Sequence, residues 1–310
     1  MQKTLLILGA SGLTGSKTME LAEKKFAALG TYNWRTTNRS LIKLDISDFE
    51  AARKVVKEIK PNAVLNTTAL HNVDYCESNP DEAFQINTNA VKNLVDACNN
   101  IGARFVQIST DFVFDGIKGD YQESDIPNPL SVYGLSKLKG ELEAAKCVSF
   151  AVIRTSVVYG WTLAEVQASK SSSGKPQNFG LWVLSKLKNN EEIKVVTDQY
   201  SSPTLADVLA AAALRVTDIE DNEIFHVAGT DSLSRYDFVT RLALMMGFNT
   251  KLVKPVNSSS FSQVAKRPSN SSLKSSKIAN RLNYRLLSAD ESLAVMRSQI
   301  EKESPGLLGA

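Results

Sequence analysis

The 310-residue sequence has few cysteines, few histidines and no long apolar run near its start, and each shortage excludes a class of protein. Its three cysteines and two histidines are far apart in the chain, so we expect neither a disulfide framework nor a metal site. The first apolar run, residues 5–8, ends at Gly9 and is too short for a transmembrane helix or a signal-peptide core. We therefore expect a cytoplasmic protein with no membrane partner.

An excess of charge of one sign is also missing. The formal net charge is +3 at pH 7, and lysine and arginine are dispersed along the chain. A nucleic-acid-binding surface normally needs a basic patch, so we expect no nucleic-acid partner. Hydrophobic residues make up 43% of the sequence, which is usual for globular proteins and excludes a disordered chain.

Short apolar runs alternate with longer amphipathic segments in the first half of the chain. This order predicts an α/β fold: a Rossmann-like, doubly wound parallel sheet with a smaller C-terminal substrate lobe. The clearest helices are expected from Asn79 toward Asn100, ending at Gly102, and over residues 131–146. Strands are expected at 4–8, 28–32, 41–44, 63–65, 104–108, 151–153, 193–196 and 224–227.

Three glycines follow the first predicted strand and precede a helix. They are Gly9, Gly12 and Gly15. Without side chains, the backbone can approach a pyrophosphate, and free N–H groups at the helix start face the anion. An ordinary strand–helix turn is the alternative, but the strand, the glycines and the helix lie within one βαβ unit. We therefore predict a dinucleotide site.

The end of the second strand lacks the acid that NAD sites usually carry about 20 residues after the glycines. Asn33, Arg35 and Arg39 are found there instead. An arginine pairs with a 2′-phosphate that a carboxylate would repel. We expect NADP(H) as the cofactor, with NAD(H) less favoured; the alternative is that both arginines lie in a solvated loop.

Tyr133 and Lys137 are four residues apart at the start of a predicted helix, so their side chains face the same way. A nearby ammonium favours the phenolate form of a tyrosine. This spacing alone is common on helices. The signal is sharpened by Ser109-Thr110-Asp111 at the end of the fifth strand, where ligands bind in open α/β sheets. Thr110 is placed to hydrogen-bond either the phenol or a substrate carbonyl.

Together these features resemble the extended short-chain dehydrogenases/reductases, and within them the dTDP-4-dehydrorhamnose reductase family. The similar segments occur in family order over nearly the whole chain, and the run from Ser109 to Lys137 is specific. They are residues 9–15, 66–69, 73–74, 108–116, 128–137, 140–141, 154–156, 178–179, 198–199, 202–204 and 267–268.

The resemblance implies NADPH-dependent reduction of the C4 keto group of a nucleotide-linked 4-keto-6-deoxysugar, as in dTDP-rhamnose biosynthesis. Residues 1–160 would form the NADP-binding Rossmann domain, with some later strands returning to it, and residues 161–310 mostly the substrate-binding lobe. The implied catalytic set is Thr110, Tyr133 and Lys137, in which Tyr133 donates a proton and Lys137 holds the nicotinamide ribose and lowers the pKa of Tyr133. The expected cofactor-binding residues are Gly9, Ser11, Gly12, Leu13, Gly15, Asn33, Arg35, Arg39, Asp45, Ile46, Thr68, Ala69, Tyr133 and Lys137. The expected substrate-binding residues are Thr110, Asp111, Asn178 and Arg267, and a homodimer is left open.

Several positions depart from the family pattern on the substrate side. Phe112 stands where tyrosine is usual, and Val157 where many members carry tryptophan. The polar segment 162–177, read as a loop, is longer than expected, and Lys274 stands where an acid is common. The exact sugar nucleotide therefore stays open. Phe112 also argues against the related 4,6-dehydratases, which have a glutamate there because elimination of water needs an additional acid/base.

Two alternatives remain. One is a reductase or epimerase acting on another nucleotide sugar. The other is a non-catalytic NADP-binding regulatory subunit resembling the methionine adenosyltransferase regulatory protein, because fold alone does not give function. The intact Thr110, Tyr133 and Lys137 favour an enzyme, since a regulatory protein has no need for a tuned phenol.

Overall fold

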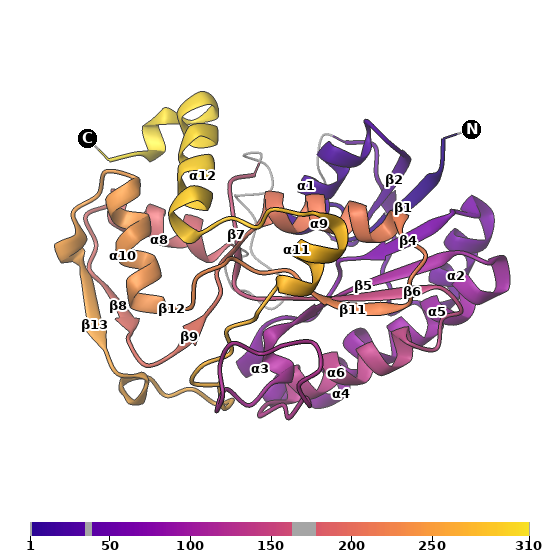
Figure 1. The fold of residues 1–310 in the computed structure, drawn as a ribbon, viewed down its shortest axis with the longest axis horizontal. Coiled ribbons are helices and arrows are strands. Elements are labelled where there is room, and N and C mark those ends of the chain that lie inside the picture. Colours follow the sequence, from indigo (N-terminus) through magenta and orange to yellow (C-terminus); the bar gives the residue numbers. More distant parts are fainter. Residues whose placement is uncertain (1, 35–38, 163–177, 310) are drawn as a thin grey trace.

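A parallel sheet of seven strands forms the frame of the molecule (Figure 1). The computed structural model describes residues 2–34, 39–162 and 178–309. The strands lie in the order β11-β6-β5-β4-β1-β2-β3, and every neighbouring pair is parallel. Their bounds are β1 Thr4–Leu8, β2 Ala27–Tyr32, β3 Ile42–Lys43, β4 Ala63–Asn66, β5 Arg104–Thr110, β6 Phe150–Thr155 and β11 Glu223–His226. The predicted fold class, a Rossmann-like doubly wound sheet, is confirmed.

Helices cover both faces of the sheet because successive strand residues point to opposite sides. In β1, Leu5 and Ile7 pack against α1 (Leu13–Ala22) and α9 (Ala206–Asp218). Leu6 and Leu8 point the other way, toward α2 (Phe49–Ile59) and α5 (Ala90–Ile101), with α6 (Val132–Ala144) on the same side. All four leucine and isoleucine side chains of this strand are fully buried, so β1 lies at the centre of two cores.

The helix expected from Asn79 toward Asn100 is present but contains a wider turn. It consists of α4 (Pro80–Phe84), a π-helical segment at Gln85–Asn89 and α5, which ends at Gly102 with a positive φ of 70°. Within the π segment, the Asn87 amide hydrogen-bonds both backbone groups of Leu70 and the hydroxyl of Ser136. These contacts are tertiary, so helical periodicity could not predict the widened turn. The short α3 (Val73–Ser78), which the sequence also did not predict, precedes it.

The second lobe has its own core, formed around α8 (Phe179–Lys188), α10 (Arg235–Met245) and α12 (Ala289–Glu303). Its strands pair two by two. They are β8 (Ile193–Val196) with β13 (Val253–Val256), β9 (Tyr200–Ser201) with β12 (Leu233–Ser234), and β7 (Val158–Tyr159) with β10 (Thr204–Leu205). Between the lobes the chain crosses back: α9 packs on α1, and β11 joins the edge of the main sheet beside β6. Helix α11 (Ser276–Leu282) packs against β11.

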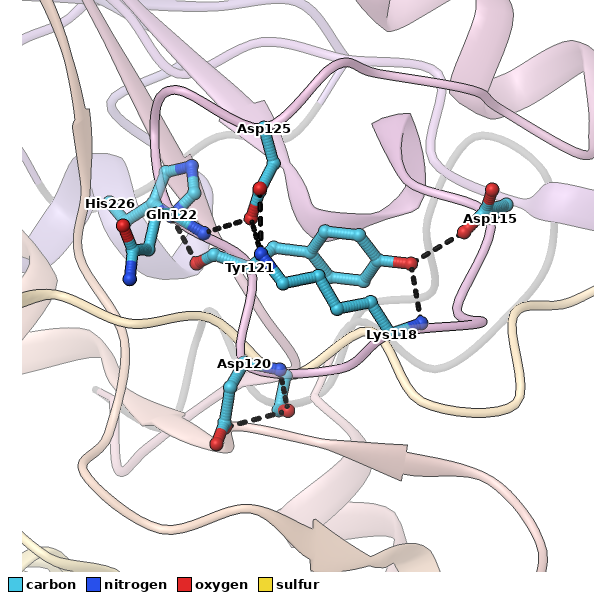
Figure 2. A network of polar contacts seen from close by, with 8 residues as sticks. Asp115, Lys118, Asp120, Tyr121, Gln122, Asp125 and His226 are labelled. Carbon is cyan, nitrogen blue, oxygen red and sulfur yellow. Dashed lines mark hydrogen bonds and ion pairs between the residues drawn. The ribbon is translucent and has the colours of Figure 1, made fainter.

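A loop between β5 and α6 is held by a dense polar network (Figure 2). The Tyr121 hydroxyl donates to Asp115 at 2.5 Å and accepts from the Lys118 backbone at 3.2 Å. The Lys118 ammonium pairs with both oxygens of Asp125 at 2.7 Å. The His226 ring, buried at the end of β11, contacts the Tyr121 carbonyl through Nδ1 at 3.0 Å. The network fixes this loop, which we call the β5–α6 loop, to the end of the sheet.

Most of the predicted loop at 162–177 lies outside the described residues, which resume at Asn178. Within the described part of the chain, no helix is both long and apolar enough to cross a membrane.

Candidate functional site

A cavity of 830 Å³ lies at the carboxyl ends of β1, β4, β5 and β6, and residues of the second lobe also line it. This is the edge where open α/β sheets bind their ligands, and the volume suits a small-molecule site. The cavity brings together most of the predicted site residues: Gly9, Ser11, Gly12, Leu13, Gly15, Asn33, Asp45, Ile46, Thr68, Ala69, Thr110, Asp111, Tyr133, Lys137 and Arg267.

The glycine loop has the close backbone approach that a pyrophosphate site requires. Gly9 has a φ of +78°, and a Cβ there would come within 2.9 Å of Thr67 and Thr68 side-chain atoms. A Cβ on Gly15 would lie 2.2 Å from the Gly9 carbonyl oxygen, so no other residue fits. Gly12 provides the N-cap of α1 without any side-chain cap, and α1 has no acid in its first turn. The N–H groups of that turn can therefore bind an anion, and the loop fits a dinucleotide.

Asn33, Asp45 and Ile46 line the cavity on the β2–β3 side. Burial opposes ionisation of Asp45, but hydrogen bonds from Ser47 and Asn33 outweigh it and hold its pKa below the ordinary value. Arg39 does not line the cavity, and its guanidinium forms an ion pair with Glu23. Arg35 lies outside the described residues. That these two arginines bind the 2′-phosphate of the cofactor therefore stays a prediction.

Tyr133 and Lys137 project from the first two turns of α6 into the cavity. Ser131 caps this helix by accepting from the Gly134 amide at 3.2 Å. The Lys137 ammonium donates to the Ile108 carbonyl at 2.7 Å, which ties α6 to the end of β5. Burial lowers the pKa of Lys137 to about 8, although the nearby Glu141 carboxylate acts in the opposite direction.

The environment of Tyr133 corrects one expectation. Burial raises the pKa of Tyr133 above its ordinary value, and the charge of Asp111 adds to this, while a hydrogen bond with Thr110 acts in the opposite direction. The Lys137 ammonium is turned to the Ile108 carbonyl. The phenol is therefore neutral over the physiological pH range, and in that form it is a proton donor.

A buried ion pair beneath Lys137 holds the elements of the site together. Arg154 on β6 forms a two-pronged contact with Glu141 on α6, with Nη2 to Oε2 at 2.7 Å and Nε to Oε1 at 3.0 Å. The Ser109 hydroxyl donates to the same carboxylate at 2.5 Å. Both charged side chains are only 3% exposed. Because removing one partner of such a pair leaves a buried charge unpaired, this contact fixes α6 against β5 and β6.

Asp111, which lines the cavity, is held in place by three hydroxyl groups. Its carboxylate accepts hydrogen bonds from Ser271 at 2.5 Å, Ser156 at 2.8 Å and Thr110 at 3.1 Å. Burial raises its pKa, and these hydroxyls partly offset the effect. Asp111 therefore links β5 and the turn after β6 to the second-lobe segment that contains Ser271.

Asn178, in contrast to Asp111, is not among the residues that line the cavity. Its side chain caps α8 by accepting from the Leu181 amide and donates to the Gly160 carbonyl, and it does not line the cavity. The helix that it caps places Phe179 and Trp182 at the cavity instead, with their rings stacked at 5.9 Å between centroids.

Two arginines of the second lobe reach the cavity, and the sequence analysis missed one of them. Arg267 pairs with Asp74 at 2.7 Å and donates to the Ala265 carbonyl at 2.9 Å. Arg235 lies over the Phe179 ring, 5.5 Å from its centroid, and Asp111 and Arg267 lie close enough to act on its charge. Arg235 is the first residue of α10, where the helix dipole disfavours a cation, and that placement is a signal that could have been used.

The described residues contain no group of three or more histidine, cysteine, aspartate or glutamate side chains placed to hold a metal ion.

Comparison with known proteins agrees with this geometry. The family model of the RmlD substrate binding domain matches residues 2–301. A probable low-salt glycan biosynthesis reductase of Haloferax volcanii is 30% identical over 94% of this chain and 96% of its own. A dTDP-4-dehydrorhamnose reductase of Aggregatibacter actinomycetemcomitans is 31% identical over 88% and 91%. The crystal structure of the Bacillus anthracis dTDP-4-dehydrorhamnose reductase, in complex with NADP, has a TM-score of 0.84 at 28% identity and covers 96% of this chain and 100% of its own.

The chain is also similar to a methionine adenosyltransferase regulatory subunit, the kind of protein considered above as the non-catalytic alternative. The methionine adenosyltransferase 2 subunit beta of Bos taurus is 28% identical over 89% of this chain and 81% of its own length.

Proposed function

Because the chain belongs to the RmlD substrate binding domain family, we propose that it is an NADPH-dependent reductase of a nucleotide-linked 4-keto-6-deoxysugar, of the dTDP-4-dehydrorhamnose reductase type. One observation carries the proposal. Thr110, Tyr133 and Lys137 line the same cavity as the glycine loop, so a proton donor and a dinucleotide cradle face one volume.

When bound, the cofactor supplies a hydride to the carbonyl carbon. The protein supplies the proton. Tyr133 is kept neutral by burial, so its hydroxyl can donate to the oxygen that becomes an alkoxide. Thr110 lies beside it, with its hydroxyl hydrogen-bonded to the wall residue Asp111, and orients the carbonyl toward the phenol. The Lys137 ammonium, held at the Ile108 carbonyl, binds ribose hydroxyls of the cofactor.

The substrate's diphosphate needs cations that are not already neutralised. Arg235 lines the cavity, and its guanidinium makes no hydrogen bond or ion pair among the described residues. Arg267 is already paired with Asp74, so its charge is partly offset. We therefore assign the main diphosphate contact to Arg235 and a supporting one to Arg267, with a bidentate geometry open to both.

The regulatory alternative is favoured by the subunit beta relative but not by the site. A chain that only binds a dinucleotide has no need for a buried neutral phenol beside a buried lysine with a pKa of about 8. A nucleotide sugar is the partner that the reductase proposal requires. A cytoplasmic location is part of the same proposal. The oligomeric state, for which a homodimer was left open, is measured by light scattering.

The test is NADPH oxidation, followed at 340 nm, with dTDP-4-keto-6-deoxyglucose-type substrates made in situ. We expect turnover with NADPH and a weaker response with NADH. A second arm adds a UDP-linked 4-keto sugar to separate the dTDP assignment from a reductase of another nucleotide sugar. NADPH binding without oxidation of cofactor by any keto sugar would instead support the regulatory subunit.

A further inference from the structure

Arg267 reaches the cavity from the second lobe, but its guanidinium is bound by a residue of the first lobe. Its Nη2 donates to Asp74 Oδ2 at 2.7 Å, and Asp74 lies in the first turn of α3. The Arg267 side chain is 11% exposed and that of Asp74 30% exposed, so water screens this ion pair only in part. Arg267 and Val73, the neighbour of Asp74, both line the cavity. The ion pair therefore joins the two lobes beside the cavity.

The Asp74 carboxylate binds the backbone next to the arginine as well as its side chain. Asp74 Oδ1 accepts from the Ala265 amide at 3.2 Å, and Arg267 Nη1 donates to the Ala265 carbonyl at 2.9 Å. Bonds to the described residues thus use two of the five N–H groups of the guanidinium, and the others can donate to a ligand. Asp74 and Ala265 together fix the direction in which those remaining groups point.

The stretch of chain that carries Arg267 has little other support. At one end Ser258 is bonded to Asp198, through its amide at 2.9 Å and its hydroxyl at 2.7 Å, and the other end is bonded to the β5–α6 loop. Between these ends Phe261 is 41% exposed and Val264 66% exposed, so packing holds the stretch weakly. The contact with Asp74 supplies the support that packing does not.

A second cation lies close to Arg267. Burial lowers the pKa of Arg235, Asp111 opposes this, and the charge of Arg267 adds to it. Two guanidinium groups near one another repel, and the Asp74 carboxylate offsets one of the two charges. Asp74 therefore allows both arginines to stay at the cavity before a ligand binds.

We propose that Asp74 is a positioning residue, which holds Arg267 from the first lobe so that its remaining N–H groups face the diphosphate of the nucleotide sugar. The inference rests on the proposed function. A side chain that is already fixed loses little conformational freedom on binding, so the ligand binds more tightly. If the carboxylate only offset the charge of Arg267, it would weaken diphosphate binding. The two roles therefore predict effects of opposite sign.

The test measures the dissociation constant of dTDP-glucose, a nucleotide sugar without a keto group, by calorimetry on the NADP⁺-bound protein. Asp74→Ala should weaken binding by about 2–10-fold, the range for one side chain that must be ordered on binding. Asp74→Asn should also weaken it, because the amide places an NH₂ group opposite one of the two donors, Ala265 or Arg267. Tighter binding by either variant would show that the carboxylate only offsets charge, and would overturn the inference.

Arg267→Ala and the double variant complete a mutant cycle. Because Asp74 acts through Arg267, Asp74→Ala should cause no further loss in the Arg267→Ala background, and an additive loss would contradict the proposal. Asp198→Ala is the matched control, since it frees the other end of the same stretch and should bind dTDP-glucose like the wild type. An equal loss in Asp198→Ala would show that general loosening of the stretch is the cause.

Kinetics separates this inference from the proposed function. In Asp74→Ala the KM for the keto sugar should rise by the same factor, with kcat and NADP⁺ affinity unchanged. A fall in kcat alone would contradict the positioning role. A wild type that binds dTDP-glucose but oxidises NADPH with no keto sugar would overturn the proposed reductase, while the binding data would still decide the role of Asp74.

Discussion

The cavity wall and the β5–α6 loop are both lined with polar side chains at the same edge of the sheet, but they differ in how those side chains are satisfied. In the loop, Tyr121, Asp115, Lys118 and Asp125 bond one another (Figure 2). In the wall, within the described part of the chain, the Arg235 guanidinium has only an aromatic ring beneath it. Polar groups that satisfy one another set the shape of the protein, whereas those left unsatisfied are available to a ligand.

The largest difference between the cavity wall and the loop is expected when a tyrosine hydroxyl is removed from each. Tyr133→Phe removes a hydroxyl from the cavity and should reduce kcat by about 10²–10⁴-fold, the usual contribution of a general acid, with NADPH affinity retained. Tyr121→Phe removes one from the loop and should leave kcat near the wild-type value. Steady-state kinetics of the two variants decides the matter, and equal losses would mean that the phenol of Tyr133 is not the proton donor.

Removing an arginine should sharpen the contrast between available and engaged charges. Arg235→Ala should raise the KM for the sugar nucleotide by about 10–100-fold, the range for a charge-assisted contact, with kcat and NADPH affinity little changed. Arg267→Ala should raise KM less, because Asp74 already offsets that charge. Arg281→Ala, which removes an exposed arginine paired with Asp221, is the matched control. A larger effect at Arg267 than at Arg235 would reverse the assignment.

The buried histidine of the loop network should make stability depend on pH. Burial, together with the charge of Arg154, lowers the pKa of His226 to about 3, so the folded protein keeps the ring neutral while the unfolded chain takes up a proton near pH 6.5. The unfolded state then binds more protons, and stability falls as the pH is lowered. Between pH 7 and pH 5 the loss from this group is about 2 kcal/mol.

Urea unfolding at the two pH values measures this loss, with His226→Gln as the comparison. The variant should be less stable at pH 7 but should lose about 2 kcal/mol less than the wild type on going to pH 5. An identical pH dependence in both proteins would show that the ring is protonated in the folded state as well.

The smallest effect is expected at the exposed rim of the loop. The Lys118 side chain is 55% exposed, so its ion pair with Asp125 is largely screened by water. Lys118→Ala should lower the free energy of unfolding by less than about 1 kcal/mol and leave NADPH oxidation unchanged. A loss of activity in this variant would show that the loop takes part in binding.

Apolar runs and glycine spacing in the sequence were enough to predict the first strand and the loop after it. The strand at Thr4–Leu8 has its predicted bounds, and the glycine loop after it lines the cavity as expected. The predicted strand at 193–196 is also found with its predicted bounds. The order of apolar and polar residues in each segment follows from which faces of the strand are buried, so the sequence alone is enough to predict it.

What depends on distant contacts could not be predicted. The π segment around Asn87 exists because Leu70 and Ser136 bind its side chain. The place of Arg235 in the cavity depends on how α10 is laid against the sheet, and the raised pKa of Tyr133 depends on its burial. Sequence spacing places Tyr133 and Lys137 on one helix face, but it does not say that the lysine turns to the Ile108 carbonyl.

The return of the chain to the main sheet affects how the protein is made. Among the described residues, the edge of β6, which ends at Thr155, is completed by β11, which begins at Glu223. At roughly 5–20 residues per second, a ribosome needs several seconds to synthesise the intervening segment. During that interval the nascent chain presents an unpaired strand edge to other chains. Ribosome-associated chaperones would be most useful in that window, and a gene fragment ending near residue 160 would make the exposure permanent.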